Sequence, residues 1–145
     1  MKLISLDLLR RVVRSVAKKY PIELIYLFGS RSYGRDDAES DIDLAFLLKD
    51  SVSKDKRFKI RLALMSEIAD ALGVESEIVD IVMLQDASIL LQYNAVHAGC
   101  PLFQKTRMKR ALYEVRVWRE YDDERYYMER DNKITLQKIL SSRTL

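Results

Sequence analysis

The stretch GSRSYGRDDAESDIDLAF, residues 29–46, joins a glycine-serine turn to two carboxylates at the start of an apolar run. Asp41 and Asp43 lie in DIDLAFLLK, a composition typical of a buried strand. Side chains two positions apart on a strand point to the same face, roughly 6.6 Å apart along the chain. Two unpaired carboxylates there would repel each other and lose hydration. A hard cation such as Mg²⁺, which prefers oxygen ligands, relieves both costs.

A third carboxylate, Asp80, interrupts the apolar run EIVDIVML, where it shares a strand face with Ile78 and Val82. Taken separately, Asp41 could be a turn residue at the start of a strand, and Asp80 an exposed residue of an edge strand. Together with the loop between the first two strands, the three acids favour a metal site made of Asp41, Asp43 and Asp80.

The loop that precedes the aspartates supplies groups that suit a phosphate. Gly29 and Ser30 directly follow the apolar run 22–28, and glycine allows backbone N–H groups to approach a ligand closely. Ser30 can cap a short helix, whose N-terminus is a phosphate site, and Arg31 and Arg35 add positive charge. A Gly-Ser pair after a strand is usually an ordinary turn, so its significance comes from its distance to the aspartates.

Strands and helices are predicted to alternate along the chain. Apolar residues at helical spacing indicate the helices, and short β-rich runs indicate the strands. Gly73 is expected to end the second helix and Asp86 to cap the third. The alternation predicts an α+β, or layered α/β, domain with a small sheet covered by helices. The expected helices span 5–20, 54–72, 86–97 and 106 onward; the expected strands span 22–28, 41–49 and 77–84, with a turn at 99–101 and a short apolar stretch at 102–103.

Composition narrows the class of protein. The 145 residues suffice for one domain with a normal core. The net charge is only +3, which lacks the single-sign field of a nucleic-acid binder, so nucleic acid is not expected as a direct partner. The single cysteine excludes an internal disulfide and a CxxC metal site. With no secretory signal and no run of about 18 apolar residues, we expect a cytoplasmic protein without membrane contact.

The spacing of the motif carries a family resemblance. Gly29-Ser30, ten residues and Asp41-Ile42-Asp43 match the GS-x10-D-x-D pattern, and the chain resembles the DNA polymerase β-like nucleotidyltransferases. Within that superfamily it resembles the minimal nucleotidyltransferases, the antitoxin half of HEPN/MNT toxin–antitoxin pairs. The resemblance covers roughly residues 1–104, including Asp80 and the GCPLF turn, and it departs at Tyr33, where many relatives have arginine.

The resemblance implies a polymerase β palm-like fold and a two-metal mechanism. Asp41, Asp43 and Asp80 would hold Mg²⁺ ions that bridge the phosphates of ATP, with Gly29, Ser30 and Arg31 on those phosphates. Asp80 would also activate the acceptor hydroxyl. The implied reaction transfers AMP to a tyrosine of a partner HEPN ribonuclease toxin and silences it. Such chemistry relies on positioning and on stabilising the charge of an in-line displacement.

Two other functions remain open at this level. One is nucleotidyl transfer to a small molecule, as in aminoglycoside nucleotidyltransferases, which would need a substrate domain that only a dimer could supply. The other is a non-catalytic antitoxin that masks its partner by binding. Replacing Asp41 and Asp43 by asparagine should abolish the chemistry and spare the masking, so the two are separable.

The C-terminal part of the chain is expected to be a helical extension. We divide the chain into a nucleotidyltransferase domain, 1–104, and an extension, 105–145, which either belongs to the same compact unit or docks a partner. A stripe of apolar residues should run along the extension, and its Trp118 and Tyr121 are expected to pack onto a second chain, either partner or self. His97 and Cys100 have structural roles, at a helix end and as a small buried side chain. The predicted stripe consists of Met108, Leu112, Val115, Trp118 and Tyr121.

Overall fold

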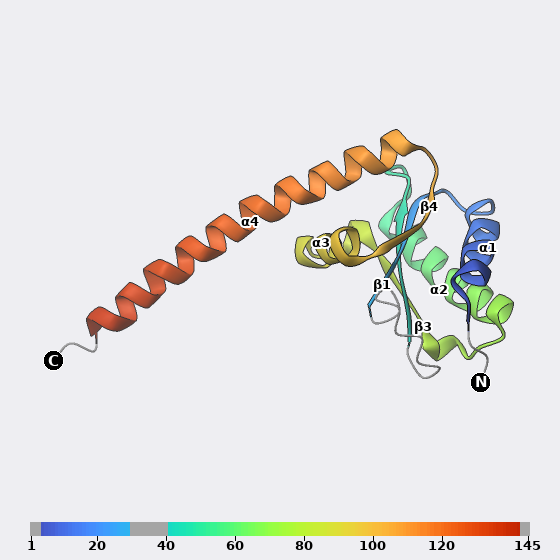
Figure 1. The fold of residues 1–145 in the computed structure, drawn as a ribbon, viewed down its shortest axis with the longest axis horizontal. Helices are drawn as coiled ribbons and strands as arrows, with labels where there is room; N and C mark the ends of the chain where they lie inside the picture. Colours follow the sequence, from blue (N-terminus) through green and yellow to red (C-terminus); the bar gives the residue numbers. More distant parts are fainter. Residues whose placement is uncertain (1–3, 30–40, 143–145) are drawn as a thin grey trace.

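A computed structural model describes residues 4–29 and 41–142, and its centre is a mixed four-stranded sheet with helices on both faces (Figure 1). β1 pairs antiparallel with β2 and with β4, whereas β2 and β3 are parallel. The order β3-β2-β1-β4 leaves β3 and β4 at the two edges. The predicted α+β fold, a small mixed sheet covered by helices, is confirmed. The strands are β1 Ile22–Phe28, β2 Ile42–Leu48, β3 Val79–Met83 and β4 Cys100–Gln104.

Each face of the sheet has its own apolar core. α1 (Leu6–Ala17) and α2 (Lys54–Leu72) pack on one face, and α3 (Ile89–Ala98) with the first turns of α4 (Arg107–Ser142) pack on the other. Residues of β2 alternate between the two cores: the first takes Ile42, Leu44, Phe46 and Leu48, and the second takes Ala45 and Leu47. By the same alternation Asp43 points to the face that α3 covers.

Serine residues begin three of the helices. Ser5, Ser53 and Ser88 each accept a hydrogen bond from the backbone N–H three residues later, which satisfies a donor that the first turn leaves unpaired. Gly73 ends α2 as predicted, with φ of 70°. The prediction that Asp86 caps the third helix is wrong: Ser88 is the cap, and Asp86 belongs to a short 3₁₀ turn, Leu84–Asp86, between β3 and α3.

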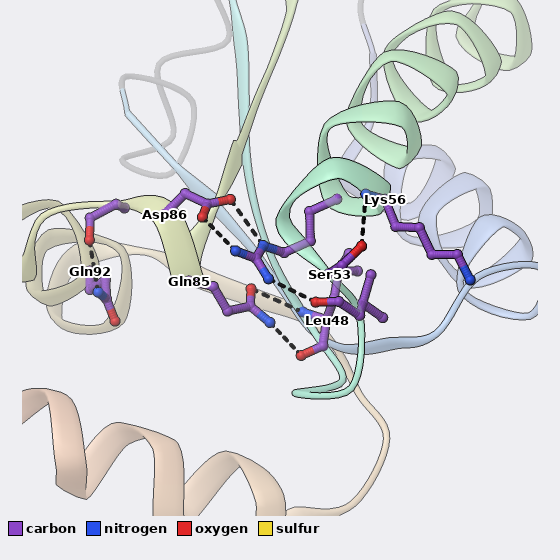
Figure 2. Close-up of polar contacts among 9 residues, drawn as sticks. Leu48, Ser53, Lys56, Gln85, Asp86 and Gln92 are labelled. Carbon is purple, nitrogen blue, oxygen red and sulfur yellow. Dashed lines mark hydrogen bonds and ion pairs between the residues drawn. The ribbon is translucent and has the colours of Figure 1, made fainter.

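Asp86 instead fastens the end of β3 to the start of α2. Arg57 donates from Nε and Nη2 to the two carboxylate oxygens of Asp86, at 3.0 and 2.7 Å, and from Nη1 to the carbonyl of Val52 at 2.8 Å. Next to this pair, Gln85 bonds both the N–H and the carbonyl of Leu48 (Figure 2). The two contacts hold the ends of β2, β3 and α2 together, so β3 is clamped at its C-terminal end.

Asp86→Asn should destabilise the protein by about 1 kcal/mol at pH 7, as expected for a two-pronged but partly exposed ion pair. The hydrogen bonds from Arg57 are the main cause that lowers the pKa of Asp86 below its usual value. Because its pKa is lowered, the Asp86 carboxylate stabilises the fold fully above the unfolded pKa of about 3.9. This stabilisation is lost as the pH falls through the folded pKa. Urea unfolding should therefore show a larger difference between variant and wild type at pH 7 than at pH 3. The exposed Asp70→Asn serves as the control, and an equal loss in both variants would contradict this role.

The long helix α4 has an anchored inner part and an exposed outer part. Its 36 residues correspond to about 54 Å, and Figure 1 shows it leaving the sheet as one continuous rod. The Tyr26 hydroxyl of β1 donates to Glu114 at 2.8 Å, and Arg110 donates to the same oxygen at 2.8 Å. All residues from Asp122 to Ser142 are exposed. The sheet therefore holds only the first four turns or so of α4.

The stripe predicted for this helix is not the face that enters the core. Met108, Leu112 and Val115 are more than half exposed, whereas Tyr113 and Val117 are buried. Tyr113 donates its hydroxyl to Gln92 of α3 at 3.0 Å, which lets this polar aromatic residue lie inside. The sequence offers two apolar faces on α4, and only the position of the sheet and α3 selects between them.

Aromatic rings join α3 to α4. Tyr121 stacks on Tyr93 with ring centroids 3.7 Å apart, and Trp118 meets Tyr93 and His97 edge-on at 5.1 and 5.4 Å. Tyr121 therefore packs partly within the chain, and its predicted contact with a second chain stays a prediction. For the exposed part of Trp118, 41% of the residue, contact with a second chain stays a prediction. His97 lies in the last turn of α3, as expected.

Cys100 and the turn around it differ from what the sequence predicted. Cys100 is half-buried and begins β4, so the predicted turn at 99–101 is shorter than expected. Arg10 directs its Nη2 to the Cys100 sulfur at 3.8 Å. In the described ranges, no helix is both long and apolar enough to cross a bilayer.

Candidate functional site

The parallel pairing of β2 and β3 brings two of the predicted carboxylates together. Asp43 is in direct register with Asp80, and Asp41 lies just before the first residue of β2. Parallel strands start at the same end of a sheet, so acids near the starts of β2 and β3 gather at one end. We call Asp41, Asp43 and Asp80 the carboxylate site. Asp80 is indeed exposed and on an edge strand, yet its register also makes it a neighbour of Asp43.

The electrostatics of Asp43 show that the carboxylates act on one another. Its pKa is raised above the usual value, first by burial and then by the negative charges of Asp80 and Asp41. Burial disfavours a charge, and like charges nearby disfavour it further. Among the described residues, no cationic side chain forms an ion pair with Asp43. The site would therefore gain from a bound cation.

Gly29 places the end of β1 against these acids. Phe28 is in register with Asp43, and Gly29 follows it with φ of 79°, a backbone conformation that side-chain-bearing residues rarely adopt. A Cβ atom at this position would collide with the Oδ2 atom of Asp43. Gly29 therefore brings the backbone close to Asp43, and its contact with a phosphate stays a prediction. Ser30 and Arg31, predicted to contact phosphates, lie outside the described residues.

Arg61 is a neighbour of the site that sequence reasoning missed. Its Nε donates to the carbonyl of Ile81 at 2.6 Å, and its Nη2 lies 3.9 Å from Oδ1 of Asp80. The second contact is long and exposed, so it holds Asp80 only weakly. In the sequence Arg61 is one cation among several on an amphipathic helix, and no local signal separates it from the others.

The carboxylate site could supply part, but not all, of the ligands of a Mg²⁺ ion. In residues 4–29 and 41–142, no three His, Cys, Asp or Glu side chains form a ready group for a metal ion. Mg²⁺ is usually held by one or two carboxylates together with substrate phosphates and water, not by a complete protein cage. Adjacent carboxylates, one with a raised pKa, suit that arrangement. Neighbouring carboxylates such as Asp43 and Asp80 could thus bind the ion when phosphate oxygens complete its shell.

Comparison with known sequences agrees with the geometry. Residues 12–108 match the family described as "Polymerase beta, Nucleotidyltransferase". The chain is also 33% identical over 94 residues to the protein adenylyltransferase MntA of Shewanella oneidensis. That alignment covers 64% of this chain and 63% of the relative's length.

Solved structures extend the similarity to almost the whole chain. A toxin–antitoxin structure with AMP-PNP is 26% identical, with a TM-score of 0.64, and the match covers 94% of this chain and 99% of that one. A mutant form of the toxin–antitoxin MntA–HpeT is 25% identical with a TM-score of 0.63 and the same coverage. Both matches reach beyond residue 108, so the likeness includes part of α4.

Proposed function

This chain belongs to the polymerase beta family of nucleotidyltransferases, and from that premise we propose that it transfers AMP from ATP to a tyrosine of a HEPN ribonuclease toxin. It thereby acts as the antitoxin. The name of the 33% identical relative, protein adenylyltransferase MntA, supports protein as the acceptor. The AMP-PNP bound in a similar toxin–antitoxin structure supports ATP as the donor.

The observation that carries the proposal is the register of Asp43 with Asp80, beside Gly29. In this proposal Asp41, Asp43 and Asp80 hold Mg²⁺ ions, with Ser30 and Arg31 on the phosphates of ATP. The bound Mg²⁺ would neutralise charge that develops on the phosphoryl oxygens. The raised pKa of Asp43 indicates a site that costs stability when empty, as sites built for function often do.

In the proposed reaction these groups act on an in-line displacement at the α-phosphorus of ATP. The tyrosine oxygen attacks the α-phosphorus and forms the new P–O bond, while the bond to the β-phosphate bridging oxygen breaks. Pyrophosphate leaves with that electron pair, and Asp80, the most exposed of the paired acids, accepts the hydroxyl proton. Orientation of the two reactants accounts for much of the acceleration.

Incubation with ATP, Mg²⁺ and the partner toxin should add the mass of one or more AMP groups to partner tyrosines. The toxin's ribonuclease activity should fall in parallel. Intact-mass and peptide mass spectrometry would locate the modification, with EDTA and a tyrosine-to-phenylalanine toxin as controls. Transfer to an aminoglycoside but not to the toxin would contradict the proposal and favour the small-molecule reaction.

A masking role is a second candidate, and the outer part of α4 favours it. Its apolar side chains are exposed to solvent in the described chain, and such surfaces commonly mark contacts. We therefore retain the division into a domain, 1–104, and an extension, 105–145, whose inner turns pack on the sheet and whose outer turns dock the partner. Masking alone predicts inhibition without ATP. The exposed apolar residues are Tyr126, Tyr127, Met128, Ile134, Leu136, Ile139 and Leu140.

A further inference from the structure

A groove of about 490 Å³ runs along the free edge of β3, between α2 and the start of α3. Its floor is the strand itself, Ile81 to Met83, and its walls include Phe58 and Arg61 of α2 and Leu91 of α3. We call it the edge groove. Its surface is mainly apolar, and Phe58 on its wall is 57% exposed. A large aromatic side chain left open at a groove is a common feature of binding sites.

One end of the edge groove lies next to the carboxylate site along β3. Asp80 precedes Ile81, the first strand residue of the groove. Arg61 connects the two, since it bonds the Ile81 carbonyl and approaches Asp80. From Asp80 to Met83 the strand covers about 10 Å. At its other end the edge groove is lined by Asp86, which is held by Arg57 (Figure 2).

This geometry suits a polypeptide in extended form. In the described sheet β3 is an edge strand, and edge strands present backbone groups to which another strand can add. A stretch of about three or four residues matches the length of the groove. A nucleic-acid strand fits less well, because the lining is mainly apolar and offers one aromatic side chain, Phe58, with two cations, Lys54 and Arg61.

We propose that the edge groove binds the acceptor, as an extended and largely apolar segment of the partner protein whose tyrosine reaches Asp80. The inference rests on the proposed function, for which it supplies the acceptor subsite. The segment packs on Phe58, Val82 and Leu91. The weak contact between Arg61 and Asp80 leaves the carboxylate accessible to the tyrosine hydroxyl.

The test compares two glutamate substitutions on the same helix. Phe58→Glu introduces a charge into the edge groove, whereas Leu62→Glu introduces one at a position that is 50% exposed and does not line it. Both positions are exposed, so both variants should fold, as melting curves would verify. For AMP transfer to the toxin, Phe58→Glu should raise KM by about 10-fold or more, with kcat changed by less than about twofold. Leu62→Glu should match the wild type, and the Mg–ATP thermal shift should be the same in all three proteins.

Each other outcome overturns the inference in a distinguishable way. An unchanged KM for Phe58→Glu, with transfer intact, leaves the function standing and removes the acceptor groove. Equal losses in both variants indicate a general charge effect and also remove it. If the substitution instead lowers transfer to an RNA 3′ hydroxyl, the occupant is nucleic acid. If the wild type modifies no toxin tyrosine, the proposed function fails and the groove proposal fails with it.

Discussion

Replacing both Asp41 and Asp43 by asparagine is expected to lower AMP transfer by at least about 10³-fold, because several kcal/mol of transition-state charge stabilisation are lost with the metal. Binding of Mg–ATP should also disappear. For the wild type, a ligand at about 100 times its Kd stabilises the fold by about 2.7 kcal/mol. Calorimetry or dye-based melting with and without Mg–ATP would measure this shift. A shift in the double variant equal to that of the wild type would contradict the metal site.

When metal and nucleotide are absent, removing the charge of Asp43 should stabilise the folded protein. The pKa of Asp43 is raised, mainly by burial and then by Asp80 and Asp41. Because its pKa is raised, Asp43 contributes fully to the free energy of unfolding below the unfolded pKa of about 3.9. That contribution is lost as the pH rises through the folded pKa. At pH 7 in EDTA, Asp43→Asn should therefore be more stable than the wild type, by less than about 1 kcal/mol because solvent screens this partly exposed carboxylate. At pH 3 the difference should vanish.

Gly29→Ala is the second change with a large expected effect. The positive φ would strain any side chain, and the new Cβ would collide with the carboxylate of Asp43. Since that carboxylate must move, transfer should fall by about 10²-fold or more, as expected for a displaced reacting geometry. Stability should fall by about 1–3 kcal/mol from the backbone strain. Steady-state transfer kinetics and urea unfolding would measure the two losses.

Gly73→Ala provides a matched control for backbone strain. Gly73 has a similar φ of 70°, but a Cβ there would meet no atom within 4 Å. Its substitution should cost about 1–2 kcal/mol of stability and leave the Mg–ATP shift and kcat unchanged. If Gly29→Ala lost no more activity than Gly73→Ala, close contact with Asp43 would not be the reason for the glycine.

Local sequence signals predicted most elements of the fold. The bounds of β1 and α2 agree with the prediction because Pro21 and Gly29 flank one and Gly73 ends the other. Asp41, Asp43 and Asp80 could be selected because charged residues inside apolar strands are costly unless they have a role. The spacing from Gly29 to Asp43 then connected the acids to a turn that is predicted to bind phosphate.

Other features depended on contacts between distant residues. The cap of α3 at Ser88 was missed because Asp86, an equally good capping residue, is engaged by Arg57 from another helix. The buried face of α4 could not be chosen, since both faces are apolar and only α3 and the sheet distinguish them.

By itself, the sequence determined which residues could form the carboxylate site and that strands carry Asp43 and Asp80, because burial preference and turn chemistry act over a few neighbouring residues. Tertiary structure decided that β2 and β3 run parallel, so that Asp43 lies next to Asp80. The negative charge of Asp80 helps to raise the pKa of Asp43. Tertiary structure also placed Arg61 and Phe58 of α2 beside the free edge of β3. Strand order and helix placement arise from packing between residues far apart in the chain, and no local pattern contains that information.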